Sequence, residues 1–251
     1  DYGYYVPLFE TIKTATIIPR IREHLSRGRK VVIFHRRIQT DDASVRIHGQ
    51  RRRIPIGPPF ATVLSLARQQ LKIMKETEAD QNRTQALANA ISLFESRFGR
   101  LLGYEQTLDY RSPLEQLTSA FGREHIAFFN GNTEYHPEKG DAIDRFNADS
   151  SGVDILCVQE DSGKEGISLH DQTGRHQRVL ISLSLPVSPI TALQVEGRIY
   201  RIGNMSNAIF EYPLLGLDLE RFHFMNNFNS RVETTENLAL GELGRDLRQS
   251  F

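Results

Sequence analysis

The 251-residue chain contains no tryptophan and only one cysteine. Because Cys157 has no partner within the chain, a disulfide-stapled secreted scaffold is excluded and an intracellular setting is favoured. No apolar run approaches the roughly 20 residues needed to cross a bilayer, and the first residues lack the regions of a signal peptide. We therefore expect no membrane association. The absence of an initiator Met suggests a fragment or a processed chain.

Neither sign of charge dominates, because 31 Lys and Arg residues balance 31 Asp and Glu residues. Such a chain can bind nucleic acid only through a local basic surface. The histidines lack the spacing of metal ligands, and with a single cysteine no zinc site is expected. No G-x-G-x-x-G follows the first apolar run, which disfavours a dinucleotide-binding enzyme.

The motifs that hold nucleoside triphosphate and magnesium are also missing. There is no G-x-x-x-x-G-K-[ST] sequence, since Gly163 and Lys164 lack both the upstream glycine and the following hydroxyl. No D-E-x-[HD] pair is present to hold magnesium. We therefore expect the isolated chain to be inactive as a nucleoside triphosphatase.

Short apolar runs alternate with helical stretches along most of the chain. The runs that have the composition of buried strands are 31–34, 126–129, 153–158 and 179–183, with 208–214 as a further candidate. The expected helices are 12–27, kinked or restarted at Pro19, then 137–146 and 189–201. Buried strands that alternate with helices predict an α/β fold with a parallel sheet and right-handed crossovers.

Residues 41–123 interrupt this alternation. They begin with a Gly/Pro-rich piece at 49–59 and continue with helical periodicity at 60–78 and 83–102, followed by a helix start at Ser112 and Pro113. We interpret them as a helical insertion within a single lobe, 1–251. Residues 217–251 are expected to form a C-terminal helical extension.

The most informative stretch is 194–203, Q-V-E-G-R-I-Y-R-I-G. Ser188 and Pro189 upstream predict a helix start, with an N-cap hydroxyl and proline at the first helical position. The polar face of this helix holds Gln194, Arg198 and Arg201 at i, i+4 and i+7, and its apolar face holds Ala192, Val195, Ile199 and Ile202. Two arginines alone are also compatible with an ordinary solvated helix face.

A second polar segment, 159–169, follows the predicted strand 153–158. Gly163 and Gly166 permit close backbone approach, and Ser168 offers a hydroxyl to phosphate or sugar oxygens. Open α/β sheets bind ligands at the carboxyl ends of their strands, so we expect the arginines and this loop at that edge. Taken alone, the loop is equally typical of an ordinary strand-to-helix turn.

The order Q-x-x-G-R-x-x-R-x-G resembles motif VI of superfamily-two helicases and Swi/Snf-type DNA translocases, and 159–169 resembles their motif V. The segments 30–35, 129–131 and 141–147 match the earlier conserved pieces of the same lobe in the same order. The long link between the two motifs is similar to the strawberry-notch-type branch. Related lobes also occur in bacterial and phage DNA-modification and antirestriction proteins. The resemblance implies a C-terminal RecA-like lobe, a parallel sheet flanked by helices.

The resemblance also implies roles for individual residues. Arg198 and Arg201 would be arginine fingers, and Ser168 would lie near the DNA strand. The residues implied near ATP are Gln194, Gly166, Gly197 and Asp161. ATP and Mg²⁺ would be held mainly by an N-terminal RecA-like lobe of the same polypeptide. The alternative is a RecA-like module that binds nucleic acid or protein without catalysis.

The insertion carries a separate signal. No acidic residue occurs in 43–75, whereas basic residues are frequent: Arg46, Arg51, Arg52, Arg53, Arg68, Lys72 and Lys75. A local basic stripe is typical of a surface that contacts the phosphate backbone of DNA. The alternative is a solvated loop whose charge is balanced elsewhere.

Overall fold

The computed structural model describes residues 2–36, 42–47, 50–77, 80–129, 138–159, 166–185, 189–222 and 224–225. The chain divides into two compact units. We call Asp1–Leu8 with Asp41–Arg111 the helical unit, and Phe9–Thr40 with Ser112–Phe251 the sheet unit.

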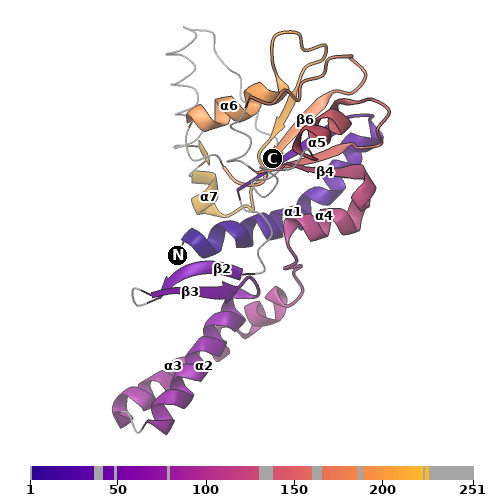
Figure 1. The fold of residues 1–251 in the computed structure, drawn as a ribbon. Helices are drawn as coiled ribbons and strands as arrows, with labels where there is room; N and C mark the ends of the chain where they lie inside the picture. The colour runs from indigo at the N-terminus through magenta and orange to yellow at the C-terminus, as the bar shows by residue number, and fades with distance from the viewer. Residues whose placement is uncertain are drawn as a thin grey trace. The chain divides into compact units, whose positions relative to one another are not determined.

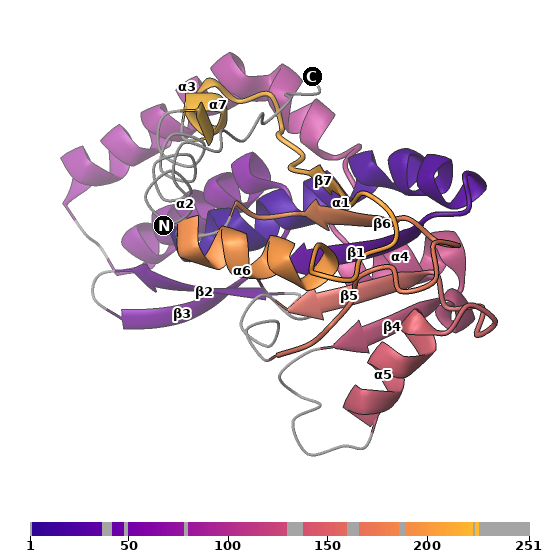
Figure 2. The same ribbon diagram turned by 90° about the horizontal axis from the view of Figure 1, so that it is seen from above.

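The sheet unit is built on five parallel strands in the order β4-β5-β1-β6-β7 (Figures 1 and 2). The strands are β1 (Lys30–His35), β4 (Ile126–Phe129), β5 (Ile155–Gln159), β6 (Arg178–Ser182) and β7 (Ile209–Glu211). In the central strand β1 all six residues are buried, as expected for a strand covered on both faces. The predicted α/β fold is thus confirmed, and the sheet is compatible with a RecA-like lobe.

Helices cover both faces of this sheet. The helices of the unit are α1 (Tyr2–Ser26, of which the residues up to Leu8 belong to the helical unit), α4 (Pro113–Phe121), the 3-10 turn η1 (Arg123–His125), α5 (Glu138–Asn147), α6 (Pro189–Ile199) and α7 (Asp218–Phe222). Val31 and Ile33 pack in one cluster with residues of α1 and α4, and Val32 and Phe34 pack in the other with residues of α5 and α6. Alternate side chains of one strand therefore enter opposite layers of core.

The helical unit consists of an antiparallel strand pair and a helix pair. The elements are β2 (Asp42–Ile47), β3 (Gln50–Pro55), α2 (Pro59–Glu76) and α3 (Gln81–Glu105). Figure 1 shows α2 and α3 lying side by side. The rings of Phe60, Phe94 and Phe98 join the two helices, with centroids 4.9 to 5.9 Å apart. Glu105 accepts hydrogen bonds from the backbone N–H groups of Phe60 and Ala61 at the amino end of α2, where the N–H groups have no acceptor within the helix.

The structure differs from the prediction in three places. Helix α1 begins at Tyr2 and continues through Pro19 as one helix, since Ile17 and Ile21 on either side are both buried. The β2–β3 pair was not predicted: β2 alternates between polar and apolar residues, but β3 contains three consecutive arginines and lies in the piece that was interpreted as Gly/Pro-rich. Of the predicted C-terminal helical extension at 217–251, α7 covers a short part, and 223 and 226–251 lie outside the described residues.

No helix in the described part of the chain combines the length and apolar character that crossing a membrane requires.

Candidate functional site

Helix α6 carries the motif that dominates the sequence. Its apolar face is buried as predicted at Ala192, Val195 and Ile199, which are 0, 2 and 0% exposed. The prediction is wrong for Ile202, which is fully exposed. The helix ends at Ile199, and the chain then turns through Gly203 with a φ of 92°, so the helical spacing does not extend that far.

The two arginines lie together at the carboxyl end of α6. Arg201 is exposed, and its Nη1 donates to Ser168 Oγ at 2.9 Å. Arg198 is partly buried; burial lowers its pKa, and the positive charge of Arg201 lowers the pKa further. The shift leaves the guanidinium of Arg198 protonated at neutral pH. The structure thus brings together three of the predicted site residues.

This arginine pair does not lie at the carboxyl edge of the sheet, so that expectation is wrong. The backbone N–H of Leu169 donates to the carbonyl of Arg198, and the carbonyl of Leu169 accepts from Nε of Arg178, the first residue of β6. The carboxyl end of α6 is therefore next to the amino ends of the strands. The reason is the crossover itself, because a helix that leaves the end of β6 must return to the start of β7.

The remaining predicted residues are more scattered. Gln194 is exposed on α6 and Gly166 is exposed at the start of the described segment 166–185. Gly197 lies within α6, where a β-carbon added to the residue would meet no atom within 4 Å, so packing in the described part does not require glycine there. Asp161 lies outside the described residues.

Two residues that the sequence did not indicate hold the segment around Ser168. Asn147, at the end of α5, donates from Nδ2 to the carbonyl of Ser168 at 3.0 Å. Arg178 is 3% exposed, reaches the carbonyl of Leu169 at 3.1 Å, and places its guanidinium 5.0 Å from the centre of the Phe146 ring. These hydrogen bonds from α5 and β6 hold the backbone at Ser168 and Leu169, and thereby position the hydroxyl that contacts Arg201.

A buried aspartate organises the loop that follows the arginines. Asp171 is fully buried and accepts hydrogen bonds from the N–H groups of Thr173 and Gly174 and from the hydroxyl of Ser206. Burial alone would raise the pKa of Asp171, but these hydrogen bonds lower it below its ordinary value. Gly174 has a φ of 74°, and an Asp followed by such a glycine is a turn signal that the sequence does contain.

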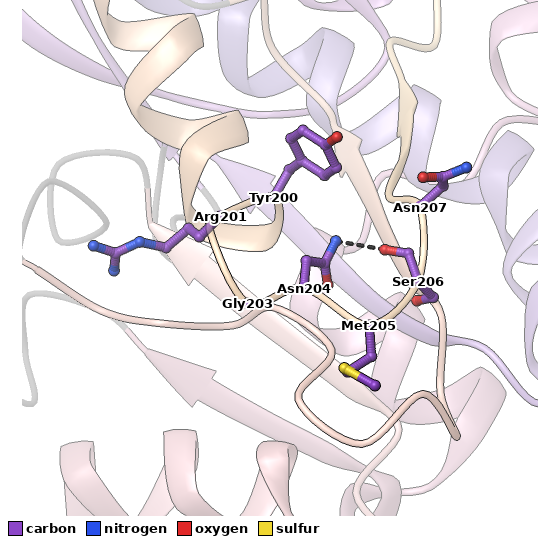
Figure 3. Close-up of a pocket in the computed structure, with 7 residues that line it drawn as sticks. All are labelled: Tyr200, Arg201, Gly203, Asn204, Met205, Ser206 and Asn207. Atoms are coloured by element: carbon purple, nitrogen blue, oxygen red, sulfur yellow. Dashed lines mark hydrogen bonds between the residues drawn. The ribbon is translucent and has the colours of Figure 1, made fainter.

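The loop borders a hollow of about 440 Å³. Its lining residues are Tyr200, Arg201, Gly203, Asn204, Met205, Ser206 and Asn207. Figure 3 shows the side chains of Arg201 and Tyr200 leaving the backbone in different directions, with the amide of Asn204 hydrogen-bonded to Ser206. The lining residues therefore include an aromatic ring, a cation and amide groups, and none of them is acidic.

Of the predicted basic residues of the insertion, four lie on the β2–β3 pair (Arg46, Arg51, Arg52 and Arg53) and three lie on α2 (Arg68, Lys72 and Lys75). The backbone register places Arg46 opposite Arg51, Val45 opposite Arg52 and Ser44 opposite Arg53. Arg51 and Arg53 are exposed, and two residues apart on a strand they project from the same side.

Within the ranges that the structure describes, no group of three or more His, Cys, Asp or Glu side chains could hold a metal ion. Cys157 is buried in β5, and burial raises the pKa of its thiol to about 12. The thiol is consequently protonated at neutral pH and unsuited to attack a substrate.

No protein-family model matches the chain, and no curated protein matches it either. Among solved structures, the chain is similar to the C-terminal part of the Fun30 ATPase domain, with 18% sequence identity and a TM-score of 0.37. That match covers 46% of this chain and 36% of the other. The fold assignment therefore rests on the sheet topology, and any functional assignment rests on the residues at the end of α6.

Proposed function

We propose that this chain is the C-terminal motor lobe of an ATP-dependent DNA helicase or translocase. In this proposal Arg198 and Arg201 contact the phosphates of ATP, which is held with Mg²⁺ mainly by an N-terminal RecA-like lobe of the same polypeptide. Gln194, Gly166, Gly197 and Asp161 are proposed to lie near the same nucleotide.

The observation that carries the proposal is the pairing of two guanidinium groups at an exposed helix end. Placing Arg201 beside Arg198 is electrostatically unfavourable, as the lowered pKa of Arg198 reflects in part. A phosphate group near both cations would relieve that repulsion and accept their planar donor arrays. Ser168, which holds Arg201 now, is a neutral acceptor that a phosphate oxygen can replace.

The chemistry that this arrangement supports is stabilisation of charge on a transferring phosphoryl group. Arginines supplied in this way contribute about 10³ to 10⁵ in turnover. We therefore expect Arg201→Ala, made in the polypeptide that contains both lobes, to lower ATP turnover at least about a hundredfold. Arg201→Lys should restore only a minor part, because an ammonium lacks the planar fork.

A matched control is Arg175→Ala, since Arg175 is also exposed in the sheet unit and forms a 3.5 Å surface ion pair with Asp149. Its turnover should stay within about twofold of the wild type, because such surface pairs contribute little. Wild-type turnover in Arg201→Ala would remove the arginine-finger assignment. Complete absence of turnover in the unaltered two-lobe protein would instead favour the non-catalytic binding module.

DNA contact is the second part of the proposal and involves the β2–β3 pair together with Ser168. Arg51 and Arg53 present positive charge on one exposed side of β3, with Arg46 opposite in the register and Arg52 between them. Reversal of charge at Arg51, Arg52 and Arg53 should weaken DNA binding and reduce the slope of log K against log salt by up to about 3, or about 0.9 per phosphate contact.

The control for this experiment is Arg27→Glu, at an exposed position in the sheet unit that pairs with Glu23. It should leave the salt slope unchanged. An unchanged slope in the triple variant would exclude the strand pair as a phosphate-binding surface.

A further inference from the structure

The hollow bordered by residues 200–207 has a composition suited to a specific ligand. Tyr200 is 57% exposed, so most of its ring is available to a partner. Arg201 supplies a positive charge, and Asn207 supplies an exposed amide with both donor and acceptor atoms. No acidic side chain lines the hollow to repel an anion. Its volume of about 440 Å³ lies within the range of small-molecule sites.

The loop that presents these side chains is held in place by Asp171. The backbone N–H of Asp171 donates to Asn204 Oδ1, its carbonyl accepts from the N–H of Met205, and its carboxylate accepts from Ser206. Asp171 thus bonds three successive residues of the loop. A loop ordered before binding loses less conformational entropy when a ligand arrives. The exposed ring and amide therefore project from an ordered support.

We propose that this hollow binds one nucleotide unit, with its base stacked on Tyr200, the base edge at the Asn207 amide and its phosphate toward Arg201. Aromatic rings stack on any base, and side-chain amides hydrogen-bond to base edges. Arg201 is the lining residue suited to a phosphate oxygen. The nucleotide is either free or part of a single strand of nucleic acid, because both present the same base and phosphate. The inference rests on the proposed function, in which Arg201 meets phosphate groups.

The absence of tryptophan from the chain provides a direct test. Tyr200→Trp introduces a single indole at the hollow, and a base stacked on it should quench its fluorescence. Three probes are titrated into the full 251-residue chain: a 12-nucleotide oligothymidylate, an abasic oligonucleotide of the same length, and ATP. Tyr104→Trp is the matched control, since Tyr104 is 64% exposed but lies in the helical unit.

Saturable quenching of the Trp at position 200 by oligothymidylate or by ATP, with none by the abasic strand, is the expected result. The probe that quenches identifies the source of the nucleotide. The Tyr104→Trp chain should show no such quenching. Equal quenching by the abasic strand, or no quenching by any probe in a folded Tyr200→Trp chain, would overturn the proposal.

A second set of variants tests the proposal even if the tryptophan itself abolishes binding. With the probe that quenches, labelled with a fluorophore, Tyr200→Ala should raise Kd about 5- to 150-fold, the range that base stacking on an aromatic residue contributes. Asn207→Ala should raise it by a smaller factor, and Met225→Ala, at an exposed position outside the hollow, should leave it unchanged. Equal Kd values in all three variants would also overturn the proposal.

These measurements separate the inference from the proposed function. They leave Arg201 intact and read base contact in this chain alone, whereas the test of the proposed function reads ATP turnover in the two-lobe protein. Normal turnover in Arg201→Ala combined with quenching of the Trp at position 200 would remove the arginine-finger assignment and keep the nucleotide site.

Discussion

Lys30 is the buried charge on which we expect the stability of the sheet unit to depend most. Its side chain is 1% exposed at the start of the central strand. Its Nζ donates to the carbonyls of Phe146 at 2.8 Å, Ala148 at 2.8 Å and Val153 at 3.0 Å. Because the last carbonyls of a helix have no partner within it, Lys30 completes the end of α5 and ties it to the segment that enters β5.

The effect of Lys30→Met follows from these three bonds. Each buried carbonyl that loses its donor costs about 1 to 3 kcal/mol, which gives an upper range of about 3 to 9 kcal/mol. Methionine offsets part of this loss, because it keeps the apolar stem and removes a buried cation whose desolvation costs several kcal/mol. We therefore expect the free energy of unfolding to fall by about 2 to 5 kcal/mol.

Urea unfolding of the full chain, followed by circular dichroism, measures this loss. The matched control is Lys72→Met, since Lys72 is largely exposed and its ammonium lies 3.8 Å from Glu76. That variant should change the free energy of unfolding by no more than about 0.5 kcal/mol. A loss in Lys30→Met as small as in the control would refute the reasoning about the end of α5.

The pH dependence offers an independent check on Lys30. Burial lowers its pKa, and the positive charge of Arg178 lowers it further. The unfolded chain therefore binds this proton more tightly than the folded chain, so stability rises with pH between the lowered pKa and the ordinary value of 10.5. The stability difference between the wild type and Lys30→Met should accordingly grow over this window. A difference that stays constant would show that the charge is not responsible.

Two further predictions concern buried carboxylates. Although burial opposes the shift, hydrogen bonds from His24 and Arg20 lower the pKa of Glu211 from 4.5 to about 2. The ionised carboxylate of Glu211 therefore stabilises the fold by roughly 1 to 3 kcal/mol after allowance for solvent screening. This stabilisation is present above pH 4.5 and is lost as the pH falls toward 2. The urea midpoints of the wild type and Glu211→Gln should therefore converge in acid. In the helical unit, Glu105→Ala should lower the free energy of unfolding by about 2 to 4 kcal/mol, because two N–H groups at the start of α2 lose their acceptor. Glu76→Ala, at an exposed position, is the control and should have little effect. Equal urea midpoints in the two variants would exclude the capping role of Glu105.

The strands of the sheet were predictable because their signal is local. Residues 31–34, 126–129 and 179–183 are continuous apolar runs, and each corresponds to an observed strand within about one residue at either end. Strands covered on both faces need no alternation of polar and apolar residues, so an unbroken run identifies them. The parallel arrangement followed from the helices between the runs.

The β2–β3 pair was not predictable by the same reasoning. Its second strand is dominated by Arg51, Arg52 and Arg53, a run that has neither apolar alternation nor high strand propensity. The pair forms instead because six residues of β2 pair in register with six residues of β3. Backbone pairing of this kind depends on the partner strand, and composition does not report it.

The residues that support Ser168 and the loop after Arg201 were hidden for a related reason. Asn147, Arg178 and Asp171 are polar residues whose positions in the sequence suggest exposure, yet Arg178 and Asp171 are buried. Each acts through a backbone atom or side chain that is distant along the chain: Asn147 reaches Ser168 and Asp171 reaches Ser206. The sequence could indicate Arg198 and Arg201 because they lie three residues apart in one short motif. It could not indicate contacts that arise only when separate elements meet.

The support of Arg201 by a hydroxyl has a consequence for its proposed role. A carboxylate in place of Ser168 would neutralise the guanidinium, and an incoming phosphate would have to break that ion pair first. The hydroxyl of Ser168 orients Arg201 through one hydrogen bond, worth about 1 kcal/mol, and leaves its positive charge uncompensated by that contact. The carbonyl end of α6 also favours two neighbouring cations, since the helix dipole is negative there. The fold thus stabilises the arginine pair by means that an anionic ligand can replace, and this is the property that a phosphate-contacting arginine requires.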